Sequence, residues 1–298
     1  MRDDFCVFIL THGRPDRVHT YKTLMKAGYT GKVYIVIDDE DDTADEYRKR
    51  YGDKVLQFCK AEVAKTTDTG DNFGILGTIT YARNVCWDLA RQVGVRYFIQ
   101  LDDDYMAFFI RHNLQCEYIC HQVRNSKSMD DILEAMVDFL DGSGALTVAM
   151  SQGGDHLGGV SNSHPALRRK AMNSFICSTD RQFCFAGHMN EDVNTYTSRS
   201  RRGDLFFTVV QAQLTQTATQ SNDGGISELY RDVGTYVKSF YSVMYAPSCV
   251  QIGVMGDHHH LTPRYRIHHK INWHHTAPKI LREEHRKPGL EPHKKEQV

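Results

Sequence analysis

The sequence Tyr97-Phe98-Ile99-Gln100-Leu101-Asp102-Asp103-Asp104 is the clearest structural signal in this chain of 298 residues. Its first five residues are mostly apolar, which predicts a buried strand at Tyr97–Leu101. The three aspartates that follow repel one another unless a cation or hydrogen-bond donors compensate their charge. A divalent ion with oxygen ligands is the natural partner, and an exposed acidic turn is the alternative. The neighbouring sequence has to decide between these two roles.

Upstream of this stretch, predicted strands and helices alternate. Apolar runs and helical spacing predict them in this order: strand Phe5–Leu10, helix Asp16–Ala27, strand Val33–Ile37, helix Ala44–Tyr51, strand Val55–Cys59 and helix Thr80–Val93. Pro15 suits the first turn of the first helix, and Gly28 suits its end. Residues 60–77 show no clear period and predict a long loop. The alternation predicts an α/β fold with a Rossmann-like, mostly parallel sheet flanked by helices.

Polar residues follow three of the predicted strands at their carboxyl ends. They are Thr11–Arg14, Asp38–Asp39 and Asp102–Asp104. In a parallel sheet these ends lie at one edge, which is where open α/β sheets bind ligands. We therefore expect a binding site at that edge.

The second half of the chain has weaker patterns. Asp130–Leu140 predicts an amphipathic helix, and Thr147–Met150 and Phe206–Gln211 predict strands. His112, Cys116 and Cys120 are spaced by four, so a helix would place them on one face as a partial zinc site. The residues around Tyr118 suit a strand equally well, and a strand would disperse the three side chains. We favour the strand.

The composition limits the class of protein. Hydrophobic residues make up 41% and charged residues 24%, as in globular proteins. No apolar run approaches the roughly 20 residues of a membrane span, and the N-terminus lacks the features of a signal peptide. We therefore expect a cytoplasmic protein with reduced cysteines, no membrane partner and no evident obligate protein partner.

The charge is distributed unevenly although the formal net charge is only −1. From Leu261 to Val298 there are nine Lys or Arg residues against four Asp or Glu. Such a basic end can bind a polyanion locally, and a solvated surface is the simpler alternative.

Further candidate residues lie near the predicted sheet edge. Arg83, close to the start of a predicted helix, suits a phosphate or a carboxylate, and its alternative role is a surface arginine. Asp38 and Asp39 can accept hydrogen bonds from a base N–H or a ribose hydroxyl, unless they only cap a helix.

Glu191 and Asp192 form a second acidic group. An inverting sugar transfer needs one carboxylate to take the proton from the attacking hydroxyl. Asp192 is the candidate base, and Glu191 would hold the acceptor or the loop. The alternative is an N-cap pair for a helix at Val193–Ser200.

A late basic segment contains His268, His269 and Lys270. One imidazole can complete the coordination of a metal, while Lys270 or Arg266 can meet a diphosphate. The residues 258–260 and His274-His275 are competing histidine groups.

Taken in their order along the chain, these motifs resemble those of GT-A glycosyltransferases over roughly Phe5 to Leu281. The resemblance implies a metal-dependent transferase with a nucleotide-sugar donor and with Mn²⁺ or Mg²⁺ as the ion. Residues 1–110 would form the nucleotide-sugar-binding half of a single domain. Residues 111–285 would form the acceptor-binding and catalytic half, and residues 286–298 a flexible tail.

The second half is similar to a narrower group, the TET/JBP-associated glycosyltransferases, which are encoded largely by bacteriophages. Residues 190–196, 220–225, 234–241 and 267–273 carry this similarity. It implies transfer of a sugar, with a UDP-sugar as the expected donor, to the hydroxymethyl group of a modified pyrimidine. The expected acceptor is 5-hydroxymethylcytosine in DNA, and a phage-encoded enzyme would act in the host cytoplasm.

The resemblance assigns roles to residues that match its motifs. Asp192 would be the base, Asp102 and Asp104 would bind the metal, and His268 or His269 would be the late metal ligand. The expected donor-binding residues are Thr11, Arg14, Asp38, Asp39, Arg83, Asp102, Asp103 and Lys270.

A DNA acceptor would also need contacts to phosphates and to the target base. Candidates for these contacts are Arg168, Arg169, Lys170, Arg199, Arg201, Arg202, Tyr236, Lys238, Phe240 and Tyr241. Two other functions stay open: a GT-A transferase for a glycan or small molecule, and a non-catalytic nucleic-acid-binding module. The complete acidic and histidine set argues against the non-catalytic module.

Overall fold

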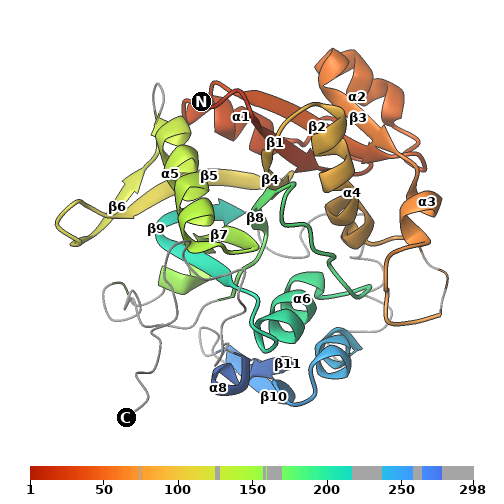
Figure 1. Cartoon of the computed structure of the whole chain (residues 1–298), viewed down its shortest axis with the longest axis vertical. Coiled ribbons are helices and arrows are strands. Elements are labelled where there is room, and N and C mark those ends of the chain that lie inside the picture. Colours follow the sequence, from red (N-terminus) through yellow and green to blue (C-terminus); the bar gives the residue numbers. More distant parts are fainter. Residues whose placement is uncertain are drawn as a thin grey trace, which may run out of the picture.

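The computed structural model describes residues 1–72, 74, 76–124, 128–156, 159, 170–216, 237–257 and 264–276. In this part of the chain, nine strands form one sheet in the order β3-β2-β1-β4-β8-β7-β9-β5-β6 (Figure 1). Helices cover both faces of this sheet (Figure 1). The predicted α/β fold class is confirmed.

The first four strands form the parallel part of the sheet. They are β1 (Phe5–Leu10), β2 (Lys32–Asp38), β3 (Val55–Phe58) and β4 (Tyr97–Asp102). β1 lies in the middle and pairs in parallel with both β2 and β4. All six residues of β1 are buried, as expected of a strand covered on both faces.

Alternate residues of β1 belong to two hydrophobic cores. Phe5, Val7 and Ile9 face the core formed with α1 (His19–Lys26), α2 (Ala44–Tyr51) and α5 (Ser128–Ser143). Cys6 and Phe8 face the core formed with α4 (Ile79–Gln92) and α6 (Glu191–Ser200). This alternation is the period of a β-strand, and it explains why helices are needed on both sides.

Antiparallel and mixed pairings complete the sheet. The strands are β5 (Tyr105–His112), β6 (Tyr118–Gln122), β7 (Thr147–Gln152), β8 (Ser174–Ser178) and β9 (Phe206–Gln216). β8 runs antiparallel to β4, and β7 runs parallel to β9. The short helix η2 (Gly153–His156) follows β7.

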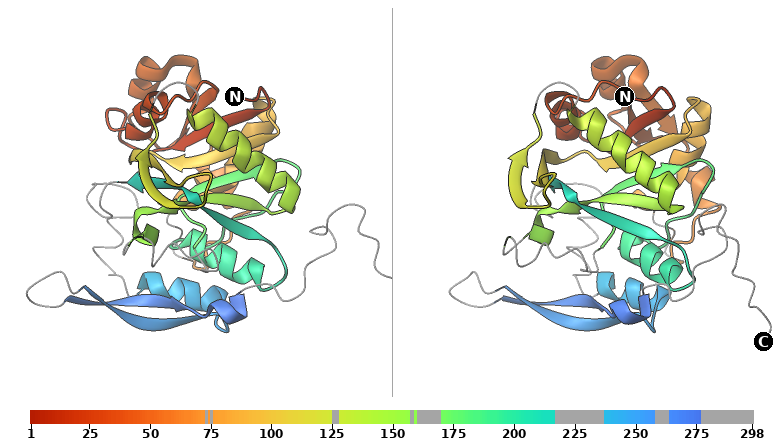
Figure 2. Two further views of the ribbon diagram at one scale, coloured as in Figure 1. Left: turned by 90° about the vertical axis from the view of Figure 1, so that its left-hand side faces the viewer. Right: turned by 60° about the vertical axis from the view of Figure 1, so that its left-hand side comes forward.

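A separate two-stranded sheet lies at the end of the molecule opposite β1–β3 (Figure 2). It consists of β10 (Val250–Asp257) and β11 (Arg264–Ile271), and the one-turn helix α8 (Trp273–Thr276) follows it. Residues 237–245 form a helix that precedes β10. Neither strand was predicted.

Two local predictions in the first half are wrong. The first helix starts at His19 and not at Asp16, so Pro15 lies in the preceding turn. Residues 60–77 are not only a loop, because α3 (Lys60–Ala64) begins there. The carboxylate of Asp39, at the end of β2, accepts the backbone N–H of Lys60 at the start of α3. This contact between segments 21 residues apart is invisible to local periodicity.

The described residues contain no helix that is both long enough and apolar enough to cross a lipid bilayer.

The strand prediction around Tyr118 is confirmed, and Cys120 lies within β6. Cys116 adopts a positive φ of 61° in the turn before β6, and His112 is the last residue of β5. The three side chains therefore come from two strands and a turn, and not from one helical face.

Candidate functional site

The acidic turn after β4 separates its three aspartates onto two sides. Asp102 and Asp104 are half-buried, whereas Asp103 and the following Tyr105 are buried. Thr20 in α1 fixes the backbone of this turn, because its hydroxyl donates to the carbonyl of Asp102 and accepts the N–H of Tyr105. The alternation of strand residues thus continues into the turn and presents Asp102 and Asp104 together.

Asp103 is held by protein groups. Its Oδ2 accepts a hydrogen bond from Thr11 Oγ1 at 2.6 Å and lies 3.3 Å from Arg14 Nε. The hydroxyl of Tyr47 also contacts Thr11 Oγ1, at 2.8 Å, and accepts the N–H of Arg14. The expected donor residues Thr11, Arg14 and Asp103 therefore meet at one edge and brace one another.

Asp38 lies at the same edge and is well compensated. His12 Nδ1 is 2.8 Å from one carboxylate oxygen, and Lys60 Nζ is 3.0 Å from the other. Burial opposes ionisation of Asp38, but the hydrogen bonds from His12 and Lys60 prevail and lower its pKa. Asp39 is exposed, and the N–H of Lys60 lowers its pKa. Both carboxylates are therefore ionised at neutral pH.

Arg83 forms a buried bridge between the acidic turn and α6. Its Nε donates to Glu191 Oε1 at 2.9 Å, and its Nη2 donates to Asp102 Oδ1 at 3.0 Å. The guanidinium also lies over the ring of Phe175, 5.0 Å from the ring centroid. Arg83 is 1% exposed, so the alternative of a surface arginine is wrong. Its contacts with two carboxylates agree with one of the two predicted ligand types, and a contact with the donor stays a prediction.

The negative charge around Asp102 is larger than the single positive charge of Arg83 can balance. Burial raises the pKa of Asp102 to about 7, and the charges of Asp104, Glu191 and Asp103 add to the shift although Arg83 opposes it. A carboxylate with this pKa is a place where a bound cation would be strongly favoured.

Asp192 lies one residue further along α6 and is 9% exposed. Burial and the charge of Glu191 raise the pKa of Asp192 to about 6, although the N–H of Val193 and the charges of Lys170 and Lys238 lower it. Glu191 and Asp192 are the first two residues of α6, and Asn190 occupies the N-cap position. The alternative in which the acidic pair caps the helix is therefore wrong.

Asn190 connects Asp192 to the C-terminal segments. It adopts a left-handed backbone conformation with φ of 55°, and its Nδ2 donates to the carbonyl of Lys238 and to Ser242 Oγ. Nδ2 also lies 3.4 Å from His269 Nδ1. The other ring nitrogen of His269 is 2.9 Å from Lys170 Nζ. Burial and the charge of Lys170 lower the pKa of His269 to about 2, so the ring is neutral.

The expected metal site of Asp102, Asp104 and one of the two late histidines is not assembled in this form. Among the described residues, no three His, Cys, Asp or Glu side chains lie close enough together to surround an ion. Asp102 and Asp104 belong to the acidic turn after β4. Both ring nitrogens of His269 contact other side chains, those of Asn190 and Lys170. His268 packs against the ring of His269, with the two centroids 4.1 Å apart.

The remaining expected residues have different positions. Lys270 is exposed on the face of β11 opposite to the buried His269, so it does not join the cluster around Arg83. Arg201 and Arg202 are exposed at the end of α6, and Arg201 Nη1 donates to Ser248 Oγ at 3.1 Å. Lys238 lies close enough to lower the pKa of Asp192. The stretch 161–169, with Arg168 and Arg169, lies outside the described residues, as do Tyr236, residues 258–260 and the expected tail 286–298.

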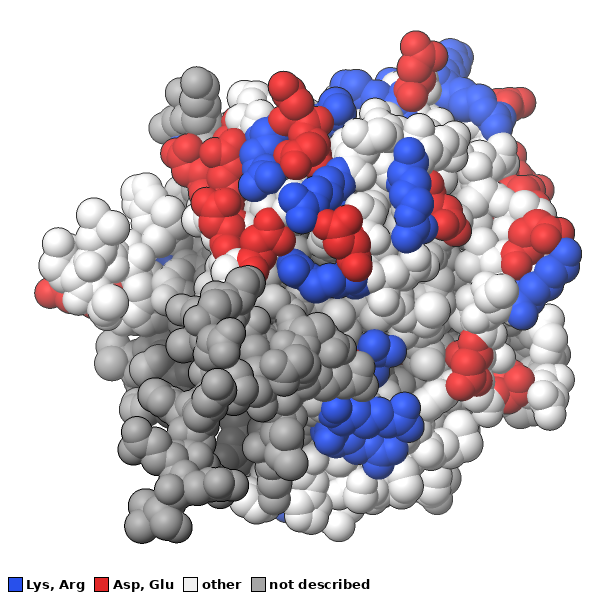
Figure 3. Space-filling view, in the orientation of Figure 1, with Lys and Arg blue, Asp and Glu red and all other residues white. Residues whose placement is uncertain are grey.

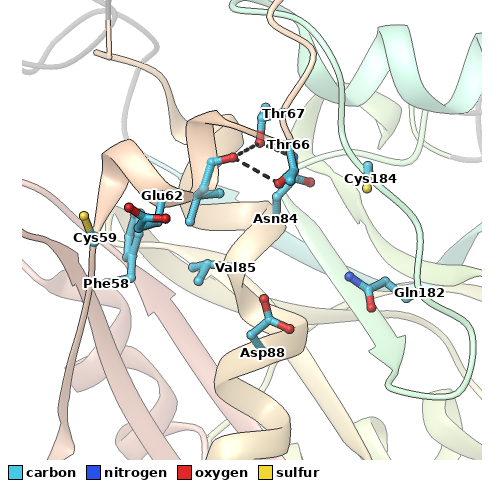
Figure 4. A pocket seen from close by; sticks show the side chains of 11 residues that line it. Phe58, Cys59, Glu62, Thr66, Thr67, Asn84, Val85, Asp88, Gln182 and Cys184 are labelled. Carbon is cyan, nitrogen blue, oxygen red and sulfur yellow. Dashed lines mark hydrogen bonds between the residues drawn. The ribbon is translucent and has the colours of Figure 1, made fainter.

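A hollow of about 310 Å³ lies elsewhere, between α3, α4 and the segment at Gln182–Cys184 (Figure 4). Its wall includes Glu62, Asn84 and Asp88, and the hydroxyls of Thr66 and Thr67 donate to the carbonyl of Val63. None of the residues expected to form the site lines it. The hollow is therefore separate from the residues around Arg83 and Asp38.

Several residues that contact the expected site residues had no role assigned from the sequence. They are His12, Tyr47, Lys60 and Asn190. His12 and Asn190 lie inside motifs that were noticed, so their polar character was the available signal. Tyr47 and Lys60 come from helices, and nothing in their local sequence indicates that they reach the sheet edge.

Comparisons with known proteins give one family and several similar folds. The family model described as TET-Associated Glycosyltransferase matches residues 5–225. A search of curated proteins found no significant match. The structure resembles that of glucosyl-3-phosphoglycerate synthase from Mycobacterium tuberculosis, solved with Mg²⁺ and uridine diphosphate. The identity is 10%, the match covers 90% of this chain and 87% of the other, and the TM-score is 0.46. It also resembles residues 1–349 of S. aureus TarS, with 14% identity, coverage of 72% and 61%, and a TM-score of 0.41.

Proposed function

The chain belongs to the TET-Associated Glycosyltransferase family, and we propose that it moves a sugar from a UDP-sugar to the hydroxymethyl group of 5-hydroxymethylcytosine in DNA. One observation carries this proposal. Arg83 contacts Asp102 in the acidic turn, which suits a donor diphosphate, and Glu191 at the start of α6. The residue after Glu191 is Asp192, whose pKa is raised to about 6. This arrangement supports a donor site and a catalytic base on either side of one arginine.

Asp102 and Asp104 are the proposed ligands of a divalent ion, Mn²⁺ or Mg²⁺. Mg²⁺ in proteins is commonly held by one or two carboxylates together with substrate phosphates, so two aspartates are enough. The raised pKa of Asp102 supports this assignment, because its surroundings contain more carboxylates than cations. When bound, the ion would neutralise charge on the leaving diphosphate.

Asp192 is the proposed general base. Its carboxylate would take the proton of the acceptor hydroxyl while the hydroxyl oxygen forms a bond to the anomeric carbon and the bond from that carbon to the diphosphate breaks. A base works best with a pKa near the operating pH, and the burial of Asp192 moves its pKa in that direction. A single displacement of this kind inverts the anomeric configuration.

The remaining residues of the sheet edge are proposed to shape the donor site. Asp38 and Asp39 would accept hydrogen bonds from the base or ribose of the nucleotide, and Thr11 and Arg14 would hold the loop that faces the diphosphate. Lys238, Arg201 and Arg202 are proposed to contact the acceptor, because Lys238 lies near Asp192 and the two arginines are exposed just after α6, the helix that contains Asp192.

Mass spectrometry of nucleosides from treated DNA tests the proposal. We expect a hexose adduct on 5-hydroxymethylcytosine when the protein is incubated with a UDP-sugar and manganese, and no adduct on unmodified DNA. Donor turnover that is indifferent to DNA would favour a small-molecule acceptor and contradict the proposal.

Calorimetry tests the metal assignment separately. Asp104→Ala should abolish the metal-dependent part of UDP binding, whereas Asp88→Asn, at an exposed position on α4, should not change it. Equal UDP affinity with and without a chelator in the unmodified protein would contradict the assignment.

A further inference from the structure

The ring of His269 in β11 is buried and yet contacts a charged side chain. It is 6% exposed, and its Nε2 lies 2.9 Å from the ammonium nitrogen of Lys170. We infer that His269 is a positioning residue, which holds the Lys170 ammonium beside Asp192 and thereby favours the ionised form of the proposed base. This inference rests on the proposed function.

The hydrogen-bond chemistry of the ring decides which atom accepts. A neutral imidazole has one acceptor nitrogen, and both of its neighbours here are donors, the Lys170 ammonium and the Asn190 amide. The contact with Lys170 is shorter, at 2.9 Å against 3.4 Å, and a charged donor makes the stronger hydrogen bond. Nε2 of His269 therefore accepts from Lys170, and the ring proton is on Nδ1.

Lys170 is fixed at both ends by this contact and by its backbone. Its carbonyl accepts a hydrogen bond from Thr208 Oγ1 in β9 at 2.9 Å, and the next residue, Ala171, is buried in the core formed with α4 and α6. The side chain then reaches His269, which belongs to the separate sheet of β10 and β11. A lysine side chain has a long flexible stem, so a partner at its tip is needed to hold the charge in one place.

The same ring packs against the start of the helix that contains the proposed base. Nδ1 of His269 lies 3.4 Å from Nδ2 of Asn190, which occupies the N-cap position of α6, two residues before Asp192. Asn190 is held in turn by the backbone carbonyl of Lys238 and by Ser242 Oγ. His269 therefore lies between the Lys170 ammonium and the first residues of α6.

Two lysines oppose the effect of burial on Asp192. Burial and the charge of Glu191 raise the pKa of Asp192, whereas the N–H of Val193 and the charges of Lys170 and Lys238 lower it. On the face viewed in Figure 3, a separate group of Lys and Arg side chains lies over the half of the molecule that holds α6. The ionised form of Asp192 therefore depends on where nearby ammonium groups are held.

Other titratable groups also lie near the proposed base. Burial raises the pKa of Tyr196, one turn further along α6, so its phenol stays neutral. Burial lowers the pKa of His269 to about 2, so its ring is uncharged and able to accept a hydrogen bond. His268 packs against that ring from the same strand, and Glu191 is paired with Arg83 at 2.9 Å. The proposed base thus titrates beside one paired carboxylate and two ammonium groups.

The imidazole itself gives a first test that needs no enzymatic activity. In protein labelled with ¹⁵N-histidine, we expect the ring of His269 to be neutral at pH 7, with its proton on Nδ1. Lys170→Met should shift the Nε2 resonance, because this nitrogen then loses its hydrogen-bond donor. A proton on Nε2 would show that the ring does not accept from Lys170 and would overturn the inference.

The pKa of Asp192, measured by NMR from ¹³C-labelled carboxyl groups and assigned with Asp192→Asn, gives the second test. Lys170→Met should raise it by about one pH unit, since a nearby opposite charge favours the ionised form. Lys170→Arg should keep it. His269→Leu should raise it as well, and His269→Gln, whose amide oxygen can accept the same hydrogen bond, should restore most of the change. Lys32→Met, at an exposed residue at the amino end of β2, is the matched control and should leave it unchanged.

A double variant distinguishes positioning from a general structural role. If His269 acts through Lys170, His269→Leu should add no further shift once Lys170→Met is present. Additive shifts would show that the ring acts on Asp192 independently and would overturn the inference. Circular dichroism should show that the variants are folded. If His269→Leu does not fold, the same cycle with His269→Gln and Lys170→Arg decides the question.

Turnover separates this inference from the proposed function. With saturating substrates, kcat of Lys170→Met should be about fivefold lower at pH 6 and close to that of the unmodified protein at pH 8, because a base with a higher pKa ionises at higher pH. If no acceptor is modified, the proposed function fails, while the NMR titrations still decide whether His269 holds the ammonium beside Asp192. An unchanged pKa of Asp192 in Lys170→Met would overturn the inference even where transfer is observed.

Discussion

The carboxylates at the end of β2 and those around Arg83 occupy neighbouring parts of one sheet edge, yet their pKa values shift in opposite directions. Asp38 is held between His12 and Lys60, and its pKa is lowered. The pKa of Asp102 is raised to about 7 and that of Asp192 to about 6. The number of partners explains the difference, because Asp38 has two cationic neighbours whereas Asp102 and Glu191 share one arginine.

The comparison distinguishes carboxylates suited to hydrogen bonding with a ligand from carboxylates suited to binding a metal ion or a proton. A compensated carboxylate such as Asp38 stays ionised and can accept hydrogen bonds at any physiological pH. An under-compensated carboxylate gains free energy from a cation or a proton, which is what a metal ligand or a general base requires. The cluster around Arg83 is therefore where we expect the reaction, and the Asp38 cluster is where we expect recognition of the nucleotide.

The largest expected effect follows from removal of the base. Asp192→Asn should reduce transfer by a factor of about 10²–10⁴ with donor binding unchanged, because the amide cannot take the proton of the acceptor. Single-turnover kinetics and calorimetry with UDP measure the two quantities. Asp38→Asn is the matched comparison, and we expect it to weaken donor binding more than turnover. Normal turnover in Asp192→Asn would remove this residue from the mechanism.

The next effect tests the arginine bridge. Arg83→Gln leaves two partly buried carboxylates without a cation and should lower the free energy of unfolding by about 3 kcal/mol, as measured by urea denaturation at pH 7. Adding Asp102→Asn and Glu191→Gln should restore much of that loss, since no uncompensated charge then remains. A loss below about 1 kcal/mol in the single variant would show that the bridge does not hold α6 against β4.

The pH dependence of turnover gives a smaller effect. With saturating donor and metal, kcat should rise about tenfold per pH unit below pH 6 and level off above it, because Asp192 must be ionised to act as a base. Asp38→Asn should keep this profile, since the lowered pKa of Asp38 leaves it ionised throughout the range. A flat profile between pH 5 and pH 7 would contradict the difference between the two clusters.

The smallest effect concerns His12. Its hydrogen bond to Asp38 raises the pKa of His12, so the pair stabilises the fold below the unfolded pKa of about 6.5. This contribution is lost as the pH rises through the raised pKa. Because the His12 side chain is 43% exposed, the contribution should stay below about 1 kcal/mol. The difference in unfolding free energy between the unmodified protein and His12→Gln should therefore shrink from pH 6 to pH 8, and a growing difference would reverse the argument.

Prediction from the sequence was strongest where structure depends on local periodicity. Strands Phe5–Leu10 and helix Ala44–Tyr51 were predicted with the observed bounds, and the strand before Asp102 was predicted to within one residue. The parallel arrangement followed from the alternation of these elements. The meeting of Thr11, Asp38 and Asp103 at one edge followed in turn, since parallel strands end on the same side.

The second half could not be predicted as well because its elements depend on distant partners. β8 lies in the sheet between β4 and β7, and β10 and β11 pair with one another in a second sheet, so each depends on residues distant in the chain. The burial of Arg83 could not be predicted for the same reason. Its burial depends on Phe175 and Glu191, which lie 92 and 108 residues away.

Local pattern alone established the α/β class, the order of the first strands and the types of residue able to bind a diphosphate and a metal ion. Those properties depend on neighbours within a few residues, where spacing and side-chain chemistry are decisive. The pKa values of Asp102 and Asp192, the bridge through Arg83 and the contact between His269 and Asn190 were decided by tertiary structure. They depend on desolvation and on charges brought together across the chain, and these quantities exist only once the chain has folded.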